Sequence, residues 1–457
     1  MPAPGSICPL SCQVDRCTSF VFTGAGGAEE GALDIAPGQT CKNNLAVHDV
    51  ACHFLHASDK IMDVLRCPEP LHKLYGPSSA AWVARIAHVS SPAVITDRSG
   101  GLNPVKELRP FMLERYFAKH EFTAPYLLCC SDCEPLSLSD IVRQADDACR
   151  SRWEQLSLGY TESTGLPALR EEVSSTYSSI PARNIVVLAP AEGIYLTLKA
   201  LLQPGDHVVV TYPGYQTLYE VARSIGCKLS FWRPELNQQR SWEFHVQQLE
   251  ALVQPDTKAV IVNFPHNPTG ALLKRGLEHD RAAKLPAAAD SYEKGISLCG
   301  VSKALSMPGL RIGWVAMQDT ALLQRIMQLR DYTTICCSAP SEVLALMGLR
   351  QQETILQRNM DCIEGNLAHL RDFFRARTNQ FEWHEPTGSS VAFVGLTSGE
   401  SANSFCEHCV TATGVLLLPG SQFDHEPSDD FSNYFRIGYG RHNLPQCMKQ
   451  LESWLDG

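Results

Sequence analysis

The stretch Ser302-Lys-Ala-Leu-Ser-Met-Pro-Gly-Leu-Arg-Ile-Gly-Trp314 decides the fold of this chain. The segment before it, Gly295-Ile-Ser-Leu-Cys-Gly-Val301, is short, apolar and rich in β-forming residues, so it predicts a buried strand. Lys303 therefore follows the end of a strand, where parallel α/β sheets present the groups that bind ligands. A lysine there can form a Schiff base with a carbonyl group, and the planar guanidinium of Arg311 can bind a phosphate.

These two groups together match pyridoxal 5'-phosphate (PLP), which carries both an aldehyde and a phosphate. A surface lysine beside a salt-bridged arginine is the commoner role of such a pair, and the spacing alone does not exclude it. Two further motifs favour the cofactor: Asn263-Phe-Pro-His-Asn-Pro-Thr-Gly270 and Phe435-Arg-Ile-Gly-Tyr-Gly440. With Lys303 and Arg311, they resemble the class I/II aminotransferases, which are fold-type I PLP enzymes. The resemblance covers residues 105–457, in the order of that family.

The resemblance implies an α/β fold with a mostly parallel central sheet in a large domain and a smaller α+β domain. A length of 457 residues also exceeds the usual size of one hydrophobic core. We predict an N-terminal extension of unknown function over residues 1–104, which is partly irregular. An N-terminal part of the small domain follows over 105–150, then a PLP-binding large domain over 151–335 and a C-terminal small domain over 336–457.

Apolar periodicity predicts the main elements around these motifs. Continuous helices are expected over residues 136–153 and 341–367, and strands over 184–188 and 258–263. Pro190-Ala-Glu-Gly193 follows the first of these strands and begins a helix, so its amides offer an anion site. The family usually has glycine in place of Pro190, which has no N–H to donate.

The resemblance assigns roles to individual residues. Lys303 would hold PLP as a Schiff base and move the substrate's α-proton, while Asn267 would donate to the phenolic oxygen. Tyr215 would stack on the pyridine ring, and Arg436 would clamp the substrate's α-carboxylate; their alternatives are an aromatic that covers the sheet edge and a structural salt bridge. The phosphate would be bound by Ala191, Glu192, Gly193, Ser302 and Arg311.

Tyr160 lies in Gly159-Tyr-Thr-Glu-Ser-Thr-Gly165, a motif that many class I/II aminotransferases share in similar form. By that resemblance it would reach the phosphate of the other subunit's cofactor, which implies a homodimer with shared sites. Without the resemblance it is a loop aromatic.

One element of the family pattern is missing. These enzymes carry an Asp that faces the pyridine nitrogen and a Tyr three residues later, at the end of a strand between the Asn-Pro-Thr-Gly strand and the lysine strand. Only 32 residues, 271–302, separate Gly270 from Lys303; two crossovers with two strands need about 45 to 50. We infer that a helix and a central strand are absent between Lys274 and Arg275. Asp290-Ser-Tyr292 has the wrong spacing to replace the pair.

This gap has two expected consequences. The sheet must either pair strands that would otherwise be second neighbours or leave two unpaired edges inside a core. The cofactor also loses its nitrogen partner and much of its strength as an electron sink.

The predicted function is a PLP-dependent aminotransferase that acts on an amino acid and a 2-oxo acid. One alternative is a catalytically impaired or non-catalytic homologue, from a splice form or a faulty gene model; Gly300, where many relatives carry a phosphate-binding serine, favours it. Another is a lyase or cyclase of the same fold, because Leu113-Glu-Arg-Tyr-Phe117 and the turn at 190–193 loosely resemble the capreomycidine-synthase-like branch.

The composition of the chain limits the classes of partner that it is expected to bind. A net charge of -10 argues against binding to nucleic acid or anionic membranes, and no apolar run is long enough to span a membrane. The first 15 residues lack Lys and Arg, so a cytoplasmic location is predicted. A nicotinamide-binding module over residues 19–34 is not expected, because the glycine pattern is incomplete.

The chain has 18 cysteines, which are scattered and are predicted to be reduced thiols. Two C-x-x-C pairs, Cys130/Cys133 and Cys406/Cys409, could together bind zinc, but nothing else in the sequence brings them together. We predict no metal site.

Overall fold

The computed structural model describes residues 18–21, 107–273, 286–424 and 431–457, and for 18–21 the backbone only. All of them belong to one compact unit that comprises Met1–Gly26 and Asn103–Gly457. The second unit, Gly27–Leu102, lies outside the described residues, as do the predicted Lys274–Arg275 junction and most of the predicted extension.

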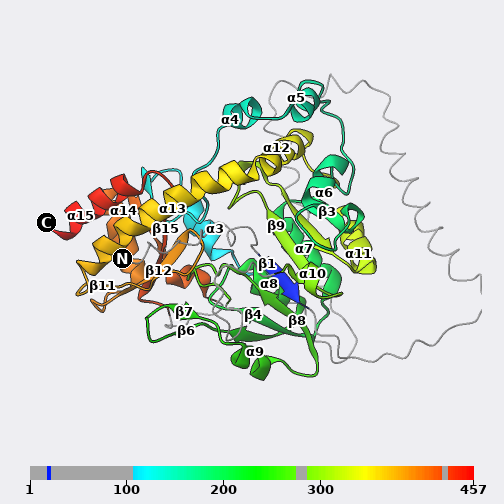
Figure 1. Ribbon diagram of the computed structural model, residues 1–457. Coiled ribbons are helices and arrows are strands. Elements are labelled where there is room, and N and C mark those ends of the chain that lie inside the picture. The colour runs from blue at the N-terminus through cyan, green and yellow to red at the C-terminus, as the bar shows by residue number, and fades with distance from the viewer. Residues whose placement is uncertain (1–17, 22–106, 274–285, 425–430) are drawn as a thin grey trace, which may run out of the picture. The chain divides into compact units, whose positions relative to one another are not determined.

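A seven-stranded sheet with the order β3-β10-β9-β1-β8-β4-β5 forms the centre of this unit (Figure 1). Its strands are β1 (Thr18–Val21), β3 (Ile185–Leu188), β4 (His207–Thr211), β5 (Lys228–Trp232), β8 (Thr257–Val262), β9 (Ile296–Gly300) and β10 (Gly313–Met317). The pairings β4–β5 and β4–β8 are parallel, and every pairing of β1 and β10 is antiparallel. All strands except β1 and β10 therefore run in one direction, which confirms the predicted mostly parallel α/β sheet.

Helices cover both faces of this sheet. Because side chains alternate along a strand, Val186 and Leu188 pack in one core and Ile185 and Val187 in another. The first core includes residues of α7 (Pro190–Leu201), α8 (Thr217–Ile225) and α11 (Thr320–Arg330). The second includes residues of α4 (Leu138–Arg143), α5 (Asp147–Glu154), α6 (Pro167–Ser174) and α12 (Ala339–Arg350).

A four-stranded sheet with the order β11-β12-β15-β14 has a core of its own. It consists of β11 (Phe381–Glu382), β12 (Val391–Leu396), β14 (Leu418–Pro419) and β15 (Tyr434–Gly438). Three helices pack in that core: α13 (Gln352–Arg375), α14 (Ala402–Thr413) and α15 (Leu444–Leu455). The predicted domain limits at 150 and 335 stay predictions.

The remaining elements are short. They are α3 (Met112–His120), α9 (Val246–Leu252), α10 (Ala288–Ser291), the parallel pair β2 (Tyr126–Leu127) with β13 (Val415–Leu416), the hairpin β6 (Glu235–Leu236) with β7 (Trp242–Glu243), and the 3-10 turns η3 (Ala182–Asn184), η4 (Pro308–Leu310) and η5 (Gly420–Phe423).

Two predicted helices are divided in the structure. The helix expected over 136–153 becomes α4 and α5, because Asp146 leaves the helical conformation and its side chain accepts from the Cys149 amide as an N-cap. The helix expected over 341–367 becomes α12 and α13, with Gln351 (φ -101°, ψ 11°) as the break between them. Strands β3 and β8 lie within one residue of their predicted limits.

The place of the missing central strand is filled by β1. No strand lies between β8 and β9 along the chain within residues 263–273 and 286–295, as the sequence predicts. Both expectations for the resulting sheet are nevertheless wrong. The strands β8 and β9 neither pair directly nor keep free inner edges, because β1 lies between them and pairs with both (Figure 1).

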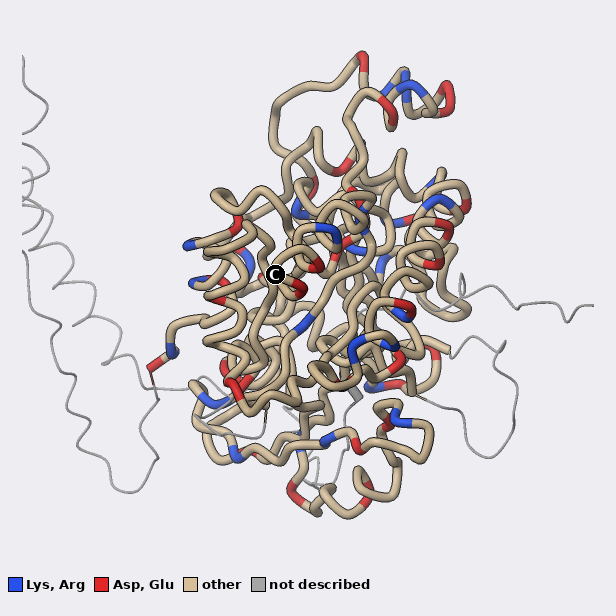
Figure 2. Tube along the Cα trace, turned by 90° about the vertical axis from the view of Figure 1, so that its left-hand side faces the viewer, with Lys and Arg blue, Asp and Glu red and all other residues tan. Residues whose placement is uncertain are grey.

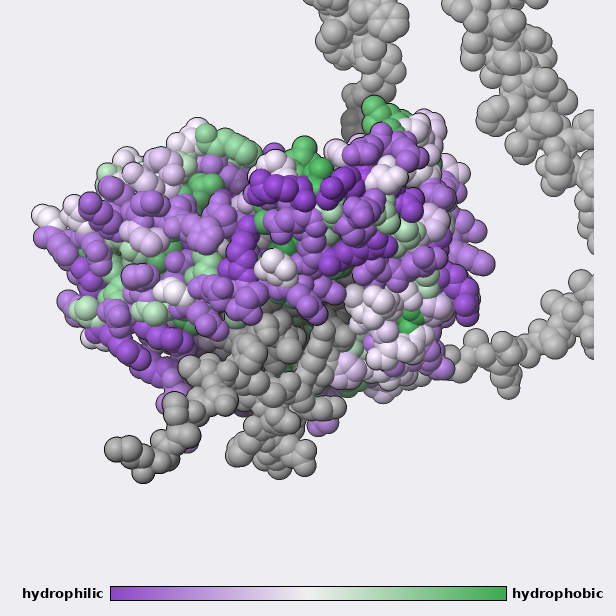
Figure 3. Space-filling view, turned by 45° about the horizontal axis from the view of Figure 1, so that its top comes forward, coloured by the Kyte–Doolittle hydropathy of each residue, from purple (hydrophilic) through white to green (hydrophobic). Residues whose placement is uncertain are grey.

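The surface of the described part carries both signs of charge, interspersed over helices and loops (Figure 2). The face drawn in Figure 3 is mostly hydrophilic, with apolar residues in small separate groups. Among the described residues, no helix has the length and hydrophobicity needed to cross a membrane.

Gly193 and Gly365 provide a matched test of helix packing. A Cβ on Gly193 in α7 would lie 2.5 Å from Leu188 Cδ1 and 2.9 Å from Leu298 Cδ1, whereas Gly365 in α13 has open space. We expect Gly193→Ala to lower the free energy of unfolding by about 1–3 kcal/mol through overpacking. Gly365→Ala should raise it by about 0.5–1 kcal/mol. Urea unfolding measures both, and equal effects would contradict the proposed close approach of α7 to the sheet.

Candidate active site

Lys303 lies in the turn that follows β9, as predicted. Its exposed side chain donates from Nζ to Ser131 Oγ at 3.0 Å. The turn is held by Asn359 of α13, whose Nδ2 donates to Ala304 O at 2.7 Å and to Ser306 Oγ at 2.8 Å. The backbone that carries the lysine is therefore fixed while its amino group stays accessible.

Ser302 and Arg311 lie on neighbouring segments, because the Val301 amide donates to Ile312 O at 3.1 Å. The Ser302 Oγ is buried and has no hydrogen-bond partner among the described residues. A buried hydroxyl without a partner is costly, so this atom needs a ligand oxygen or water. The Arg311 guanidinium is exposed, and its Nη1 donates to Pro308 O at 3.2 Å. Both groups suit a phosphate.

The first turn of α7 begins at Pro190, with Ala191 and Glu192 in its first positions. Their amides cannot bond within the helix and can therefore donate to an anion. The Gly193 amide, in contrast, already donates to Ala189 O at 2.8 Å. Of the three amides that the sequence suggested for phosphate, two remain for a ligand.

Pro190 and Gly300, the two departures from the family pattern, are in contact. A Cβ on Gly300 would lie 2.9 Å from Pro190 Cγ and 3.1 Å from Ile312 O. A serine at position 300 would therefore collide with the proline ring. The contact also places the N-terminus of α7 against the end of β9, which brings the candidate phosphate groups to one edge of the sheet.

Asn267 and Arg436 are joined by a hydrogen bond, which runs from Arg436 Nη1 to Asn267 Oδ1 at 2.9 Å. Arg436 Nε and Nη2 also donate to Cys129 O, at 3.2 and 2.6 Å. Because Asn267 Oδ1 is used as an acceptor, its Nδ2 is left to donate, as the predicted contact with a phenolic oxygen requires.

The Arg436 side chain is only 2% exposed, and among the described residues its acceptors are all neutral oxygens. Burial lowers the pKa of Arg436, because the charged guanidinium is removed from water. No described carboxylate forms an ion pair with it. The alternative role, a structural salt bridge, is thus not seen in the described part, and a ligand carboxylate would supply a negative charge.

The turn that holds Asn267 is rigid. The ring of His266 is fully buried, hydrogen-bonds Thr269 Oγ1 at 2.7 Å, and has its pKa lowered to about 3 by burial, so it is neutral. Gly270 has φ 71°, and a Cβ there would lie 2.5 Å from Val391 O in β12. Only glycine permits this close approach, which fixes the turn against the second sheet.

Tyr215 lies within electrostatic range of Arg436. Its ring centroid is 5.0 Å from that of Phe111, and its hydroxyl donates to Glu114 at 3.4 Å. Burial raises the pKa of Tyr215 to about 12, Glu114 adds to this rise, and the charge of Arg311 opposes it. The phenol is therefore protonated at neutral pH, and the ring lies within electrostatic range of Arg311.

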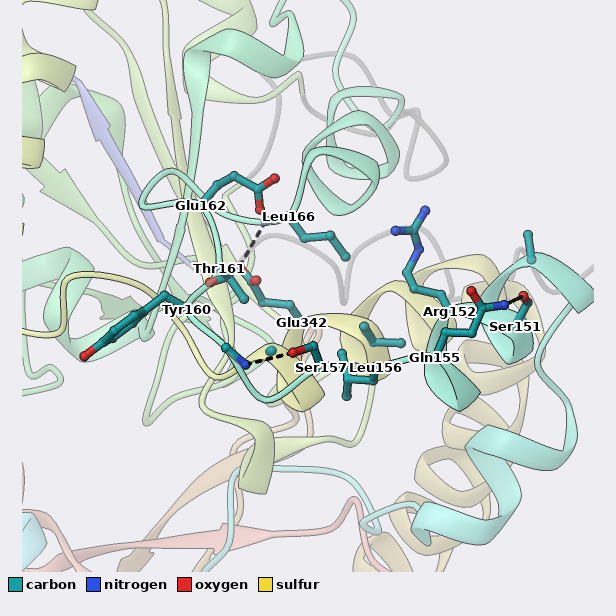
Figure 4. A pocket seen from close by; sticks show the side chains of 14 residues that line it. Ser151, Arg152, Gln155, Leu156, Ser157, Tyr160, Thr161, Glu162, Leu166 and Glu342 are labelled. Atoms are coloured by element: carbon teal, nitrogen blue, oxygen red, sulfur yellow. Dashed lines mark hydrogen bonds between the residues drawn. The ribbon is translucent and has the colours of Figure 1, made fainter.

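Tyr160 is 92% exposed and lines two adjoining cavities, of about 520 and 530 Å³. Figure 4 shows the first of them, where Glu342 accepts from the Leu166 amide at 3.2 Å. Lys303, Asn267 and Arg436 do not line either cavity. Tyr160 and Lys303 thus do not line a common cavity among these two.

The described residues supply no Asp-x-x-Tyr pair at the central strand. β1 has the sequence Thr-Ser-Phe-Val, which contains no carboxylate. Asp290, the weak substitute, accepts from the amides of Ser178 and Ser179 at 2.8–3.1 Å and has a structural role. The donor groups therefore fit the phosphate, the aldehyde and the phenolic oxygen of PLP, but the nitrogen lacks the family's partner.

Sequence reasoning missed three residues of this site. They are Ser131, Asn359 and Cys129, which contact the lysine, its turn and the arginine. Two lie in the irregular stretch 127–133, and Cys129 acts only through its carbonyl oxygen, so no side-chain pattern marks them.

The two C-x-x-C pairs do not form a zinc site in the structure. Within the described ranges, no group of three or more His, Cys, Asp or Glu residues could hold a metal ion. Cys130, Cys133, Cys406 and Cys409 are buried thiols without disulfides. Burial raises the pKa of Cys133 to about 12, so its thiolate is disfavoured.

Comparison with known proteins places this arrangement in a class of PLP-dependent enzymes. A solved PLP-dependent aminotransferase from Streptococcus suis superposes with a TM-score of 0.68 and 26% identity, over 77% of this chain and 98% of that one. The PLP-dependent cyclase OrfR superposes with a TM-score of 0.66 and 27% identity, over 78% and 99%. The fold is therefore that of fold-type I PLP enzymes.

The sequence comparisons narrow this class. The model of the family "aminotransferase class I and II" matches residues 131–277 and 276–450. Capreomycidine synthase of Streptomyces vinaceus is 27% identical over 314 residues, 63% of this chain and 77% of that protein. The (5-formylfuran-3-yl)methyl phosphate transaminase of Methanocaldococcus jannaschii is 25% identical over 328 residues, 65% and 83%.

The chain belongs to the class I/II aminotransferase family. It is a PLP-dependent aminotransferase, with amino and keto acids as its substrate classes. The two family matches meet at 276–277, next to the predicted junction after Lys274, which supports the inferred gap.

The Pro190–Gly300 contact can be tested by substitution. We expect Gly300→Ser to lower the free energy of unfolding by about 1–3 kcal/mol, because the new side chain overlaps the proline ring. Adding Pro190→Ala should recover part of this loss. Gly309→Ser is the control, since a Cβ there meets no atom within 4 Å, and its effect should stay within about 0.5 kcal/mol. Urea unfolding that shows no recovery in the double variant would contradict the contact.

Proposed function

We propose that Lys303 is the residue that binds the cofactor covalently and moves the substrate's proton. Its position after β9, its accessible Nζ and its contact with Ser131 support this role. The bound cofactor supplies an aldehyde and an electron sink. Ser302, Arg311 and the amides of Ala191 and Glu192 would hold its phosphate.

The observation that carries the proposal is the buried guanidinium of Arg436, whose acceptors in the described part of the chain are all neutral. A substrate α-carboxylate would neutralise it and accept two hydrogen bonds in a fixed plane. The Asn267 contact holds this guanidinium beside the amide whose Nδ2 would donate to the phenolic oxygen. The substrate's carboxylate and the cofactor's ring would thus be positioned by one hydrogen-bonded pair, with Tyr215 beside it.

We further propose a homodimer that acts in the cytoplasm. The side chains of Tyr160 and Leu158, which line one cavity, are 92% and 83% exposed. A second copy that covers them would bury this surface, and Tyr160 would then extend to the partner's cofactor phosphate.

A second candidate function is a lyase or cyclase reaction on an amino acid. Its support is the similarity to capreomycidine synthase and to the cyclase OrfR. The two candidates differ in the fate of nitrogen: an aminotransferase moves ¹⁵N from the amino acid to the 2-oxo acid, and a lyase or cyclase does not. A non-catalytic homologue, favoured by the missing Asp-x-x-Tyr pair, would do neither.

Replacing Lys303 tests the covalent role. In Lys303→Ala, we expect loss of the visible absorption that PLP gives on wild-type protein, and loss of at least about 10³-fold in turnover. Borohydride reduction of wild-type protein followed by peptide mass mapping should find the cofactor on Lys303. Lys294→Ala, which removes an exposed lysine ahead of β9, is the control. If PLP binding and turnover both survive Lys303→Ala, the proposed mechanism is wrong.

Arg436→Lys tests carboxylate binding. Lysine keeps a charge but cannot form the planar pair of hydrogen bonds, so KM for the amino acid should rise by about 10-fold or more, which corresponds to about 1.4 kcal/mol. Steady-state kinetics on a panel of amino acids measures this. The control is Arg371→Lys, since Arg371 pairs with Glu385 at 2.6 Å on the surface, and its KM should be unchanged. An unchanged KM in Arg436→Lys would contradict the assignment.

A further inference from the structure

The segment Thr18–Val21 occupies the place between β8 and β9 in the main sheet. Ser19 pairs with Val262 of β8 on one side and with Ser297 of β9 on the other. The register continues through Phe20, which lies opposite Ile261 and Ile296. Both edges of the four-residue strand are thus used.

The pairing satisfies backbone groups that would otherwise be buried without partners. With β1 in place, Ile261 is 0% exposed, and Ile296 and Leu298 are 1% and 3% exposed. Buried amides and carbonyls without hydrogen bonds are strongly disfavoured. The slot between β8 and β9 is therefore an acceptor for one extended strand.

The direction of the strand matters for the site. β1 is antiparallel to both neighbours, so its first residues lie at the edge where β8 and β9 end. That edge leads on to Asn267 after β8 and to Lys303 after β9. Adjacent strands are about 4.8 Å apart, so β1 keeps β8 and β9 about 10 Å apart. Without it, closure of the gap would shift Asn267 and Lys303 by about one strand spacing relative to each other.

We propose that Thr18–Val21 is a donor strand: it completes the sheet in place of the absent central strand and positions the segments that carry Asn267 and Lys303. The segment belongs to the same chain as its acceptor slot. It restores the hydrogen bonds of the missing strand but not its carboxylate, because its sequence contains none and its end points to the opposite edge. This inference concerns the sheet and does not depend on the proposed reaction.

Disulfide trapping in the full-length chain tests the pairing by its register. Ser19→Cys with Val262→Cys places two cysteines directly opposite each other, whereas Ser19→Cys with Val260→Cys shifts the pair by two residues. After mild oxidation, non-reducing peptide mapping should find at least 10-fold more of the 19–262 link than of the 19–260 link. Equal yields, or no 19–262 link in soluble folded protein, would overturn the proposal. A link that joins two chains would overturn the assignment to the same chain.

A second measurement tests the role of the strand without introducing a disulfide bond. Ser19→Pro removes an amide that a central strand needs, while Ser19→Val keeps it. Hydrogen exchange in residues 257–262 and 296–300 should be at least 10-fold faster in Ser19→Pro than in Ser19→Val. When added to the Ser19→Pro protein, a synthetic peptide of residues 12–26 should slow this hydrogen exchange again. The same peptide with proline at position 19 should not slow it. If exchange in β8 and β9 is the same in both variants, residues 18–21 are not a donor strand.

Discussion

The hydrogen bond between Arg436 and Asn267 joins the two halves of the site. Arg436 belongs to β15 of the four-stranded sheet, and Asn267 follows β8 of the seven-stranded sheet. A buried guanidinium loses the solvation of its charge, and the acceptors that the described residues provide here are neutral oxygens. The position of each sheet at this point is therefore tied to a charge for which the described part of the chain supplies no counterion. This makes the site receptive to a carboxylate and sensitive to any shift between the sheets.

Much of this arrangement was predictable from short motifs. A strand followed by Lys303, a turn with Asn267 and a strand with Arg436 each have a local signature, because strand ends and Pro/Gly turns are encoded by neighbouring residues. The mostly parallel main sheet could also be predicted. Counting the residues between Gly270 and Lys303 further predicted a missing unit after β8, and the described residues 263–273 and 286–295 contain no strand. The limits of the long helices were harder to predict, because a cap such as Asp146 ends a helix while the sequence pattern remains apolar on one face.

What the sequence did not predict are contacts between distant segments. Ser131 lies 172 positions before Lys303 in the chain and accepts a hydrogen bond from it. Asn359, in α13, donates to the turn that carries the lysine. The Pro190–Gly300 contact is similar: each residue alone is a departure from a family pattern, and only their proximity shows that one accommodates the other. The phosphate site thus loses one amide and one hydroxyl together, which leaves Ser302, Arg311 and two amides to bind the phosphate.

The pairing of β1 also sets an order of events during synthesis. Ser19 must find Val262, 243 residues later in the chain, and then β9, which ends at Gly300. At about 5–20 residues per second, the ribosome needs roughly 15 to 60 s to make the segment from Val21 to Gly300. During that time β1 lacks one or both of the strands with which it pairs. The centre of this sheet therefore cannot close before β9 has been made, and the nascent chain must keep an unpaired strand soluble until then.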